Sequence, residues 1–232
     1  MTTATGKGRI FLFLQGPHGP FFGSLGRMLR RSGATTWRVG FNAGDAAFWP
    51  DRESYIPYRG QAEDWPEDCA RLLDARGVTD IVLYGDTRPV HAAAVVAARA
   101  RGVRIHVFEE GYLRPWWVTS ERGGSNGNSR PMETGVAERQ AALAMSDAET
   151  PLPPAHWGDT RHHVFYGALY HFFVLFRNRA YAGFRPHRAL GVGQEFRLYL
   201  KRLLLMPALR AERALATRRV CNGGFPYHLV LL

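Results

Sequence analysis

A chain of 232 residues, 46% of them hydrophobic, is long enough for one large domain with a substantial core. No stretch contains the eighteen uninterrupted apolar residues of a membrane-spanning helix, and the N-terminus lacks the regions of a secretion signal, so the sequence predicts a cytosolic protein. The two cysteines, Cys69 and Cys221, stand far apart without a partner motif, which supports neither a disulfide framework nor a zinc site.

The net charge of +10 is concentrated in one segment of the chain. Residues 161–219 contain eleven arginines and Lys201 against only Glu195 and Glu212, so the remainder is balanced in charge. Such a segment suits an anionic membrane surface, a nucleic acid or an acidic ligand, or it is simply a solvated helical face. Because the sequence offers no recognisable reading helix or RNA-binding motif, we expect no nucleic-acid binding.

Four short apolar runs alternate with helix-compatible segments in the first half of the chain. The helix-compatible segments cover residues 20–34, 62–79 and 88–103, and each contains a glycine near its end that suits a helix C-terminus. This recurrence predicts an α/β fold with a Rossmann-like parallel sheet and flanking helices. The runs expected to be strands are RIFLFLQG at 9–16, TWRVGFN at 36–42, DIVLYGD at 80–86 and RIHVFEEG at 104–111.

The sequence changes character after Gly111. Residues 112–131 are rich in Gly, Asn, Ser and Pro and predict an ordered loop with aromatic anchors, and residues 137–148 suit a short helix. Residues 162–184 predict a helix with an apolar centre, either buried or lying at a membrane interface. Residues 195–219 predict an amphipathic basic helix that is kinked or broken at Pro207.

These patterns divide the chain into three parts. Residues 1–155 are expected to form the Rossmann-like N-terminal domain, and residues 156–219 a basic, aromatic-rich helical segment. Residues 220–232 resemble a loop that leads into the first strand of an incomplete second Rossmann-like domain, so we expect a fragment or a truncated product.

In an open parallel sheet, ligands bind at the carboxyl ends of the strands. The first such place is the turn of residues 15–20, where Gly16 and Gly19 permit close approach of a backbone and His18 can exchange a proton near neutral pH. The following helix offers free amide groups to an anion or a sugar hydroxyl, although a merely tight turn explains the same residues. The order of glycines is not that of a dinucleotide fingerprint.

Residues 42–45 form the second place, and residues 85–91 the third. Asp86 lies at the tip of a predicted strand, with Arg88 and His91 close behind it. A carboxylate beside an arginine suits a nucleophile or a base, but an aspartate at a strand end is equally typical of a helix cap.

Residues 109–114 form the fourth place. Adjacent strand residues point to opposite faces, so at most one of Glu109 and Glu110 should face the same cleft as Asp86. Two carboxylates across a cleft are the groups that glycosyl chemistry requires. The alternative is a buried acid paired with Arg88 or Arg114.

Five segments of the chain form a recognisable combination. They are residues 11–33, RVGFNAGDAAFW at 38–49, LYGDTRPVH at 83–91, VFEEGYLRPWWVTSERGGSNGNS at 107–129 and, more loosely, residues 162–176. In this order they resemble the N-terminal half of capsular polysaccharide biosynthesis proteins of the KpsS/LipB type. The resemblance implies a retaining transferase of GT-B-like, two-domain build that moves β-Kdo, an eight-carbon acidic sugar, from CMP-Kdo. It implies that the sugar starts the poly-Kdo linker on phosphatidylglycerol, at the cytoplasmic face of the inner membrane of Gram-negative bacteria.

The resemblance also implies roles for individual residues. Asp86 becomes the candidate nucleophile or stabilising carboxylate, and Glu110 or Glu109 the candidate proton-transfer group. No metal or cofactor is implied beyond CMP-Kdo as donor substrate, and the implied partners are this nucleotide sugar, phosphatidylglycerol or the anionic inner-membrane surface, and the capsule synthesis and export machinery. The implied substrate-binding residues are Gln15, Gly16, His18, Gly19, Arg88, His91, Arg114 and Asn126.

Members of that family continue with a second Rossmann-like domain that supplies most of the nucleotide-sugar site, including a histidine-proline motif that this sequence lacks. We therefore expect weak donor binding by this chain alone. The alternative function is that of a non-catalytic, membrane-associated component of capsule synthesis or export.

Overall fold

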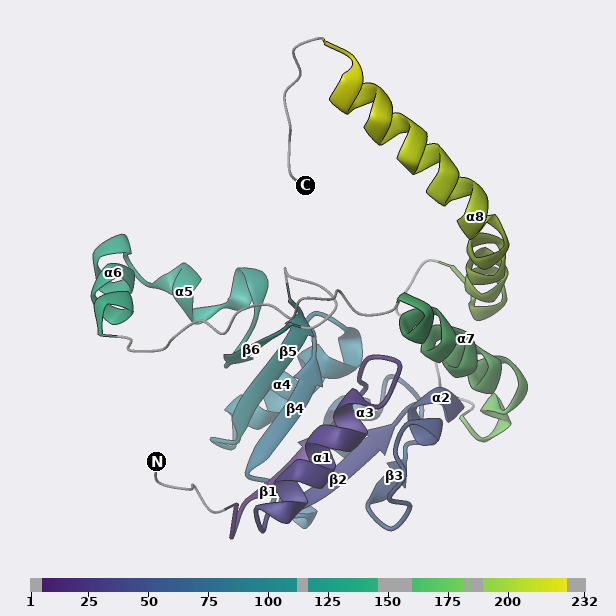
Figure 1. Ribbon diagram of the computed structural model, residues 1–232. Coiled ribbons are helices and arrows are strands. Elements are labelled where there is room, and N and C mark those ends of the chain that lie inside the picture. Colours follow the sequence, from purple (N-terminus) through teal and green to yellow (C-terminus); the bar gives the residue numbers. More distant parts are fainter. Residues whose placement is uncertain (1–5, 112–116, 146–159, 182, 184–189, 225–232) are drawn as a thin grey trace.

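The structure is a computed structural model that describes residues 6–111, 117–145, 160–181, 183 and 190–224. Within these residues the fold is α/β, with a six-stranded sheet of order β3-β2-β1-β4-β5-β6 (Figure 1). The first five strands are parallel, and β6 is antiparallel to β5. The predicted fold class is confirmed. The strands are β1 (Ile10–Phe13), β2 (Thr35–Gly40), β3 (Tyr55–Pro57), β4 (Asp80–Tyr84), β5 (Arg104–Glu110) and β6 (Val118–Arg122).

Helices cover both faces of the sheet (Figure 1). On one face, Phe11 and Phe13 of β1 pack with Phe22 of α1 (Phe21–Arg31). On the other face, Leu12 and Leu14 belong to a core cluster that includes side chains of α3 (Trp65–Ala75) and α4 (Pro89–Arg99). Alternate residues of a strand point to opposite faces, so a continuous apolar run such as 10–14 fits a strand that is buried on both sides.

The three predicted glycine stops lie where the helices end. Gly33, Gly77 and Gly102 follow α1, α3 and α4, and all three have positive φ angles, of 91°, 59° and 65°. Glycine adopts this left-handed conformation without the steric penalty of a Cβ atom. Each helix therefore stops just before the chain turns back into the next strand.

Three elements differ from the expectation for their segments. The predicted loop after Gly111 contains β6, whose residues alternate between exposed and half-buried, as expected of an edge strand beside β5. A three-residue strand, β3, extends the opposite edge, and a five-residue helix, α2 (Ala43–Ala47), follows β2. These elements are too short or too polar to produce a clear hydrophobic period.

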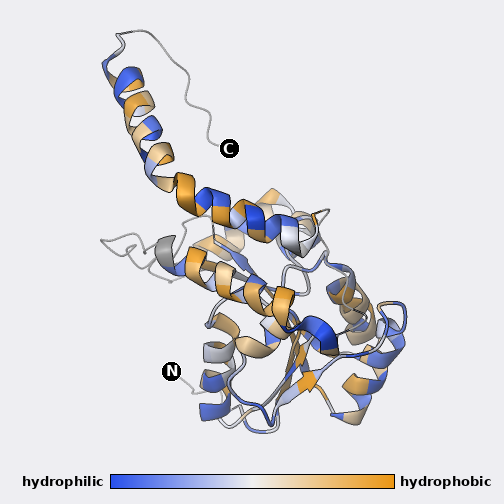
Figure 2. Ribbon diagram, turned by 90° about the vertical axis from the view of Figure 1, so that its right-hand side faces the viewer, coloured by the Kyte–Doolittle hydropathy of each residue, from blue (hydrophilic) through white to orange (hydrophobic). Residues whose placement is uncertain are grey.

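The later part of the described chain is helical, as predicted. α7 (Thr160–Phe176) packs against α2 and α8, and α8 (Val192–Asn222) continues through Pro207 without interruption. Both views show that α8 bends, so the kinked alternative holds and the broken one is wrong (Figures 1 and 2). The remaining short elements are η1 (Asn126–Asn128), α5 (Arg130–Glu133), α6 (Val136–Ala144) and η2 (Asn178–Ala180).

The C-terminal half of α8 extends away from the sheet (Figure 1). Among the helices that the structure describes, none is both long enough and apolar enough to cross a membrane. Because α8 reaches Asn222, the first residues that the sequence assigned to a second domain are helical. The strand expected beyond them falls in residues 225–232, outside the described residues.

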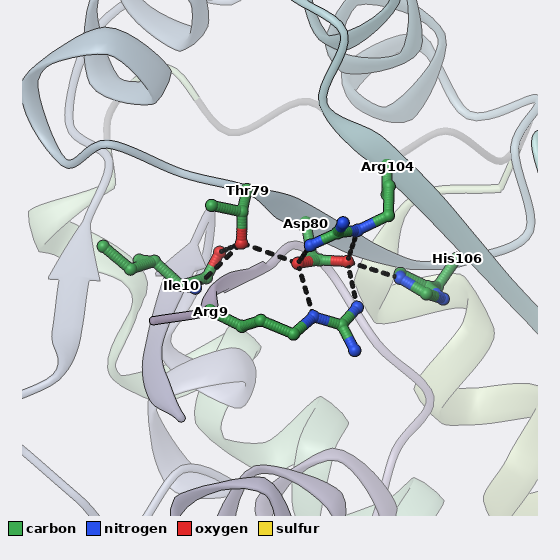
Figure 3. Close-up of polar contacts among 6 residues, drawn as sticks. All are labelled: Arg9, Ile10, Thr79, Asp80, Arg104 and His106. Atoms are coloured by element: carbon green, nitrogen blue, oxygen red, sulfur yellow. Dashed lines mark hydrogen bonds and ion pairs between the residues drawn. The ribbon is translucent and has the colours of Figure 1, made fainter. Parts of the chain in front are cut away.

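A buried carboxylate ties the strands together at their amino ends (Figure 3). Asp80 accepts hydrogen bonds from Arg9, which precedes β1, and from Arg104 and His106 of β5, the last at 2.8 Å. Burial by itself raises the pKa of the Asp80 carboxyl, but the hydrogen bonds from His106, Arg104, Arg9 and Thr79 hold the pKa well below its usual range. The cluster therefore lies at the end of the sheet opposite the carboxyl ends of the strands, where ligands of open α/β sheets bind.

Candidate active site

Asp86 lies two residues beyond the last residue of β4, at the carboxyl ends of the strands, and only 6% of its surface is exposed. Its Oδ2 atom accepts two hydrogen bonds, from the backbone N–H of Ser125 at 3.0 Å and from Asn128 Nδ2 at 3.1 Å. Its Oδ1 atom is equally buried but accepts no hydrogen bond from any described residue. Buried oxygens are normally paired, so Oδ1 is a candidate contact for a ligand.

Glu109, at the end of the neighbouring strand β5, shares a partner with Asp86. The Oγ atom of Ser125 donates to Glu109 Oε1 at 2.8 Å, and Asn126 Nδ2 donates to Glu109 Oε2. Ser125 therefore contacts both carboxylates, Asp86 through its backbone and Glu109 through its side chain. At most one of the two glutamates was expected to face the same cleft as Asp86, and Glu109 is the one that shares the partner Ser125 with it.

An open hollow of about 590 Å³ adjoins Glu109. Its volume is in the range of pockets that hold small molecules. Glu110 is exposed and belongs to this hollow, so the two adjacent glutamates both border it although only Glu109 contacts Ser125. The lining residues are Glu109, Glu110, Thr119, Glu121, Asn126, Ser129 and Met132.

Arg88, the residue that precedes α4, and His91, in the first turn of α4, follow Asp86 in the chain, but they have different surroundings. Arg88 Nη1 donates to Gln15 Oε1 at 3.3 Å, which links this turn to the end of β1. His91 is fully buried, and its Nδ1 atom lies 2.7 Å from the carbonyl oxygen of Gly85. Because a carbonyl only accepts, Nδ1 carries the proton and His91 supports the backbone beside Asp86. Its predicted role in substrate binding stays a prediction.

Helix α7 covers the ends of β1 and β2. The hydroxyl oxygen of Tyr170 accepts hydrogen bonds from Asn42 Nδ2 at 2.7 Å and from Gln15 Nε2 at 3.3 Å. Burial, together with the negative charge of Asp45, raises the pKa of Tyr170, so the phenol stays protonated. Helix α7 therefore covers the turn of residues 15–20, the first of the predicted ligand-binding positions.

The two glycines of the first turn are in close contact with side chains of this chain. A Cβ atom on Gly16 would lie 2.5 Å from Phe22, and one on Gly19, whose φ is 107°, would lie 3.2 Å from Tyr166. Packing and backbone conformation thus explain both glycines, in agreement with the tight-turn alternative. Ligand binding by these glycines stays a prediction.

His18 lies in the same turn, among aromatic and imidazole rings of α7. Its ring centroid is 5.7 Å from that of His163, 5.5 Å from that of Tyr170 and 6.0 Å from that of His171. The turn and α7 therefore contact one another directly, and His18 belongs to the junction between them.

The second place, after β2, is a closed structural arrangement. Asp45 Oδ1 lies 3.1 Å from Arg38 Nη2, and Asp45 Oδ2 accepts the backbone N–H of Phe41 at 3.0 Å. Asn42 caps α2 by accepting the N–H of Asp45 at 2.9 Å. Burial raises the pKa of Asp45 above its ordinary value, and the guanidinium of Arg38 offsets only part of this rise.

The structure thus joins Asp86, Glu109 and Asn126 in one cluster, and it joins Gln15 to Arg88. Arg114 lies outside the described residues. Within the ranges that the structure describes, no three His, Cys, Asp or Glu side chains gather as a metal site would require.

Sequence reasoning missed Ser125, Asn128 and Tyr170. Ser125 and Asn128 lie in the stretch GGSNGNS at 123–129, where the density of small polar residues was a usable signal for a turn full of hydrogen-bond donors. Tyr170 had no such signal, because its partners lie 128 and 155 residues away in the chain.

The fold and the carboxylate cluster define an α/β protein with a candidate ligand site at the carboxyl ends of its strands. Residues 79–230 match the model of the family described as "Capsule polysaccharide biosynthesis protein". The chain belongs to this family, which confirms the resemblance found in the sequence and gives the chain a role in capsule polysaccharide biosynthesis. The match includes Asp86, Glu109 and Ser125, whereas the turn of residues 15–20 precedes it.

Individual relatives agree with the family match. The chain is 33% identical over 195 residues to the capsule polysaccharide modification protein LipB of Neisseria meningitidis serogroup A, which covers 82% of this chain and 45% of that protein. The serogroup B protein gives the same values. The chain is also 39% identical over 125 residues to the capsule polysaccharide export protein KpsS of Escherichia coli, covering 53% of this chain and 31% of KpsS. The match thus spans less than half the length of each of these relatives.

Proposed function

We propose that this chain carries the catalytic carboxylates of a retaining glycosyltransferase of capsule synthesis. The transferase moves β-Kdo from CMP-Kdo to a phosphatidylglycerol acceptor and so starts the poly-Kdo linker. The observation that carries the proposal is the state of Asp86, which is buried, held through one oxygen, and adjacent through Ser125 to a second carboxylate. Two carboxylates from neighbouring strand ends are the minimum equipment of such a reaction.

The proposed reaction takes place in two steps. In the first, Asp86 Oδ1 attacks the anomeric carbon of the sugar, the bond from that carbon to the phosphate oxygen breaks, and CMP leaves with the bonding electrons. In the second step, the oxygen of the acceptor hydroxyl attacks the same carbon and the bond from that carbon to Asp86 breaks. Glu109 takes the proton of the acceptor hydroxyl during this attack. Two displacements at one carbon restore the starting configuration, as a retaining transferase requires.

The donor carries negative charge on its phosphate and on the sugar carboxylate, so the site needs a cation. Arg88 is two residues from Asp86 and contacts Gln15 across the strand ends, which supports a role in binding the donor. The relatives are more than twice as long as the part that this chain matches, so we propose that the site is completed by residues of a second half.

The acceptor proposal is supported by the surface of α8. Seven basic residues lie on this helix, and leucines such as Leu204, which is 73% exposed, and Leu215, which is 66% exposed, lie between them in the sequence. Hydrophilic and hydrophobic positions are interspersed along the ribbon of α8 (Figure 2). Arginines and leucines together suit the anionic surface of a membrane that holds phosphatidylglycerol. The same surface favours a second candidate function, that of a non-catalytic membrane-associated component.

A transfer assay tests the proposal. CMP-Kdo and a fluorescent phosphatidylglycerol analogue are incubated with this chain and with a form extended through the downstream reading frame. We expect transfer by the extended form, and its loss in Asp86→Asn and Glu109→Gln. The control Glu138→Gln alters an exposed carboxylate of α6 that does not line the hollow, and it should retain most of the activity.

A liposome experiment distinguishes the second candidate. If the protein is a membrane-associated component without activity, it sediments with liposomes that contain phosphatidylglycerol, Asp86→Asn leaves this binding intact, and no form transfers sugar. Transfer of sugar by the extended form would exclude a purely non-catalytic role.

A further inference from the structure

The turn of residues 125–128 contributes four hydrogen-bond donors to two carboxylates. The backbone N–H of Ser125 and the side-chain amide of Asn128 donate to Asp86, while the hydroxyl of Ser125 and the side-chain amide of Asn126 donate to Glu109. All four donors come from one short turn, so the relative placement of the two carboxylates depends on the conformation of that turn.

The backbone of the turn is specialised for this arrangement. Asn126 has a φ of 49°, in the left-handed region that asparagine tolerates better than most residues. A Cβ atom on Gly124 would lie 2.3 Å from the carbonyl oxygen of Asn128, so only glycine fits beside the turn. Ser125 itself is 2% exposed, and its two donors are therefore shielded from competing water.

The two carboxylate oxygens of Asp86 differ in the hydrogen bonds that they accept from this turn. Both donors to Asp86 reach Oδ2, and Oδ1 receives no hydrogen bond from the residues that the structure describes. Two donors on one oxygen fix the rotation of the carboxylate about its Cβ–Cγ bond, which leaves the other oxygen in a constant position.

We propose that Ser125 and Asn128 are positioning residues for the transfer reaction. They hold Asp86 by Oδ2 so that Oδ1 is presented to the anomeric carbon, and the hydroxyl of Ser125 places Glu109 at a matching distance from the same carbon. This inference rests on the proposed function, because it assigns Asp86 and Glu109 their roles in that reaction.

The kinetic test uses the form of the protein that shows transfer, with CMP-Kdo and the phosphatidylglycerol analogue as substrates. Hydrogen bonds to charged groups are worth enough that Ser125→Ala and Asn128→Ala should each lower kcat on the order of 10-fold to 100-fold. The KM values should change by less than about 3-fold, because neither residue is proposed to bind substrate.

Two further variants separate positioning from folding. Ser125→Thr keeps the hydroxyl and should recover most of the lost kcat, which a purely structural defect would not allow. Ser120→Ala, on the exposed surface of β6, removes a hydroxyl nearby and should behave as wild type. An unchanged kcat in Ser125→Ala and Asn128→Ala, or an equal loss in Ser120→Ala, would overturn the inference.

A second measurement does not depend on activity. Amide hydrogen exchange of Ser125 should be slow in the wild-type protein and faster in Asp86→Ala, since Asp86 Oδ2 accepts that N–H. If no form transfers sugar, the proposed function fails, while slow exchange that Asp86→Ala accelerates still establishes that the turn holds the carboxylate. Exchange that Asp86→Ala does not alter would contradict the positioning contact itself.

Discussion

The buried ion pair between Arg38 of β2 and Asp45 of α2 offers a stability test of the part of the fold that supports the site. Only 2% of the Arg38 side chain and none of the Asp45 side chain is exposed, and the guanidinium is also 5.7 Å from the ring of Phe22 and 5.8 Å from that of Trp49. Asp45→Ala leaves a cation enclosed among apolar rings without its partner. Removal of one member of a buried pair costs about 3–5 kcal/mol of unfolding free energy.

For a domain of this size, that loss lowers the midpoint of thermal unfolding by roughly 6–20 °C. Urea unfolding of the wild type, Asp45→Ala, Arg38→Met and the double variant measures the coupling directly. Because burial raises the pKa of Asp45 even beside Arg38, desolvation of the pair is expensive, and the double variant should be more stable than the sum of the single losses predicts. Asp74→Ala, which removes an exposed partner of Arg101, is the control and should change stability only slightly.

The reasoning would be refuted by single variants that lose less than about 1 kcal/mol, or by single losses that add up to the double loss. Either result would mean that Arg38 reaches water, or that the packing of its stem and not its charge matters.

Two further predictions concern acid stability and the docking of α7. The pKa of Asp80 is held below its unfolded value of about 3.9, so the contribution of Asp80 to folding stability is complete above that pH and is lost as the pH falls below it. Asp80→Asn should therefore be less stable than wild type at pH 7 and should lose less stability than wild type on acidification. Urea unfolding at pH 7 and at a pH below about 3.9 measures both effects. A Cβ atom at position 44 would lie 2.5 Å from the ring of Tyr170, so Gly44→Ala should displace α7 and speed amide exchange along it. Gly193→Ala, where no atom lies within 4 Å of the added carbon, should leave that exchange unchanged.

The parallel sheet could be predicted from the sequence because its central strands are buried on both faces. Runs such as 10–14 and 81–83 are continuously apolar, and helices α1, α3 and α4 are each followed by a glycine with positive φ. The edge strands gave no such signal. β3 has three residues, and β6 is polar from Thr119 to Arg122, so neither shows a hydrophobic period.

The carboxylates of the candidate site could be predicted in part, since strand ends point to Asp86 and to the pair Glu109 and Glu110 without a structure, but the choice between the two glutamates could not. The hydrogen bonds that connect them could not. Ser125 lies 39 residues from Asp86 and 16 from Glu109, and it approaches them only because β6 folds back on β5 and brings the following turn to the same edge. The covering of the first turn by α7 likewise depends on contacts between residues more than 120 positions apart.

The most direct test of the account is transfer of sugar from CMP-Kdo to the phosphatidylglycerol analogue by the extended form, followed by mass spectrometry of the protein after incubation with the donor alone. The account predicts transfer that Asp86→Asn abolishes, and a sugar adduct on the peptide that contains Asp86. Transfer that persists undiminished in Asp86→Asn would contradict the central claim that this carboxylate performs the chemistry.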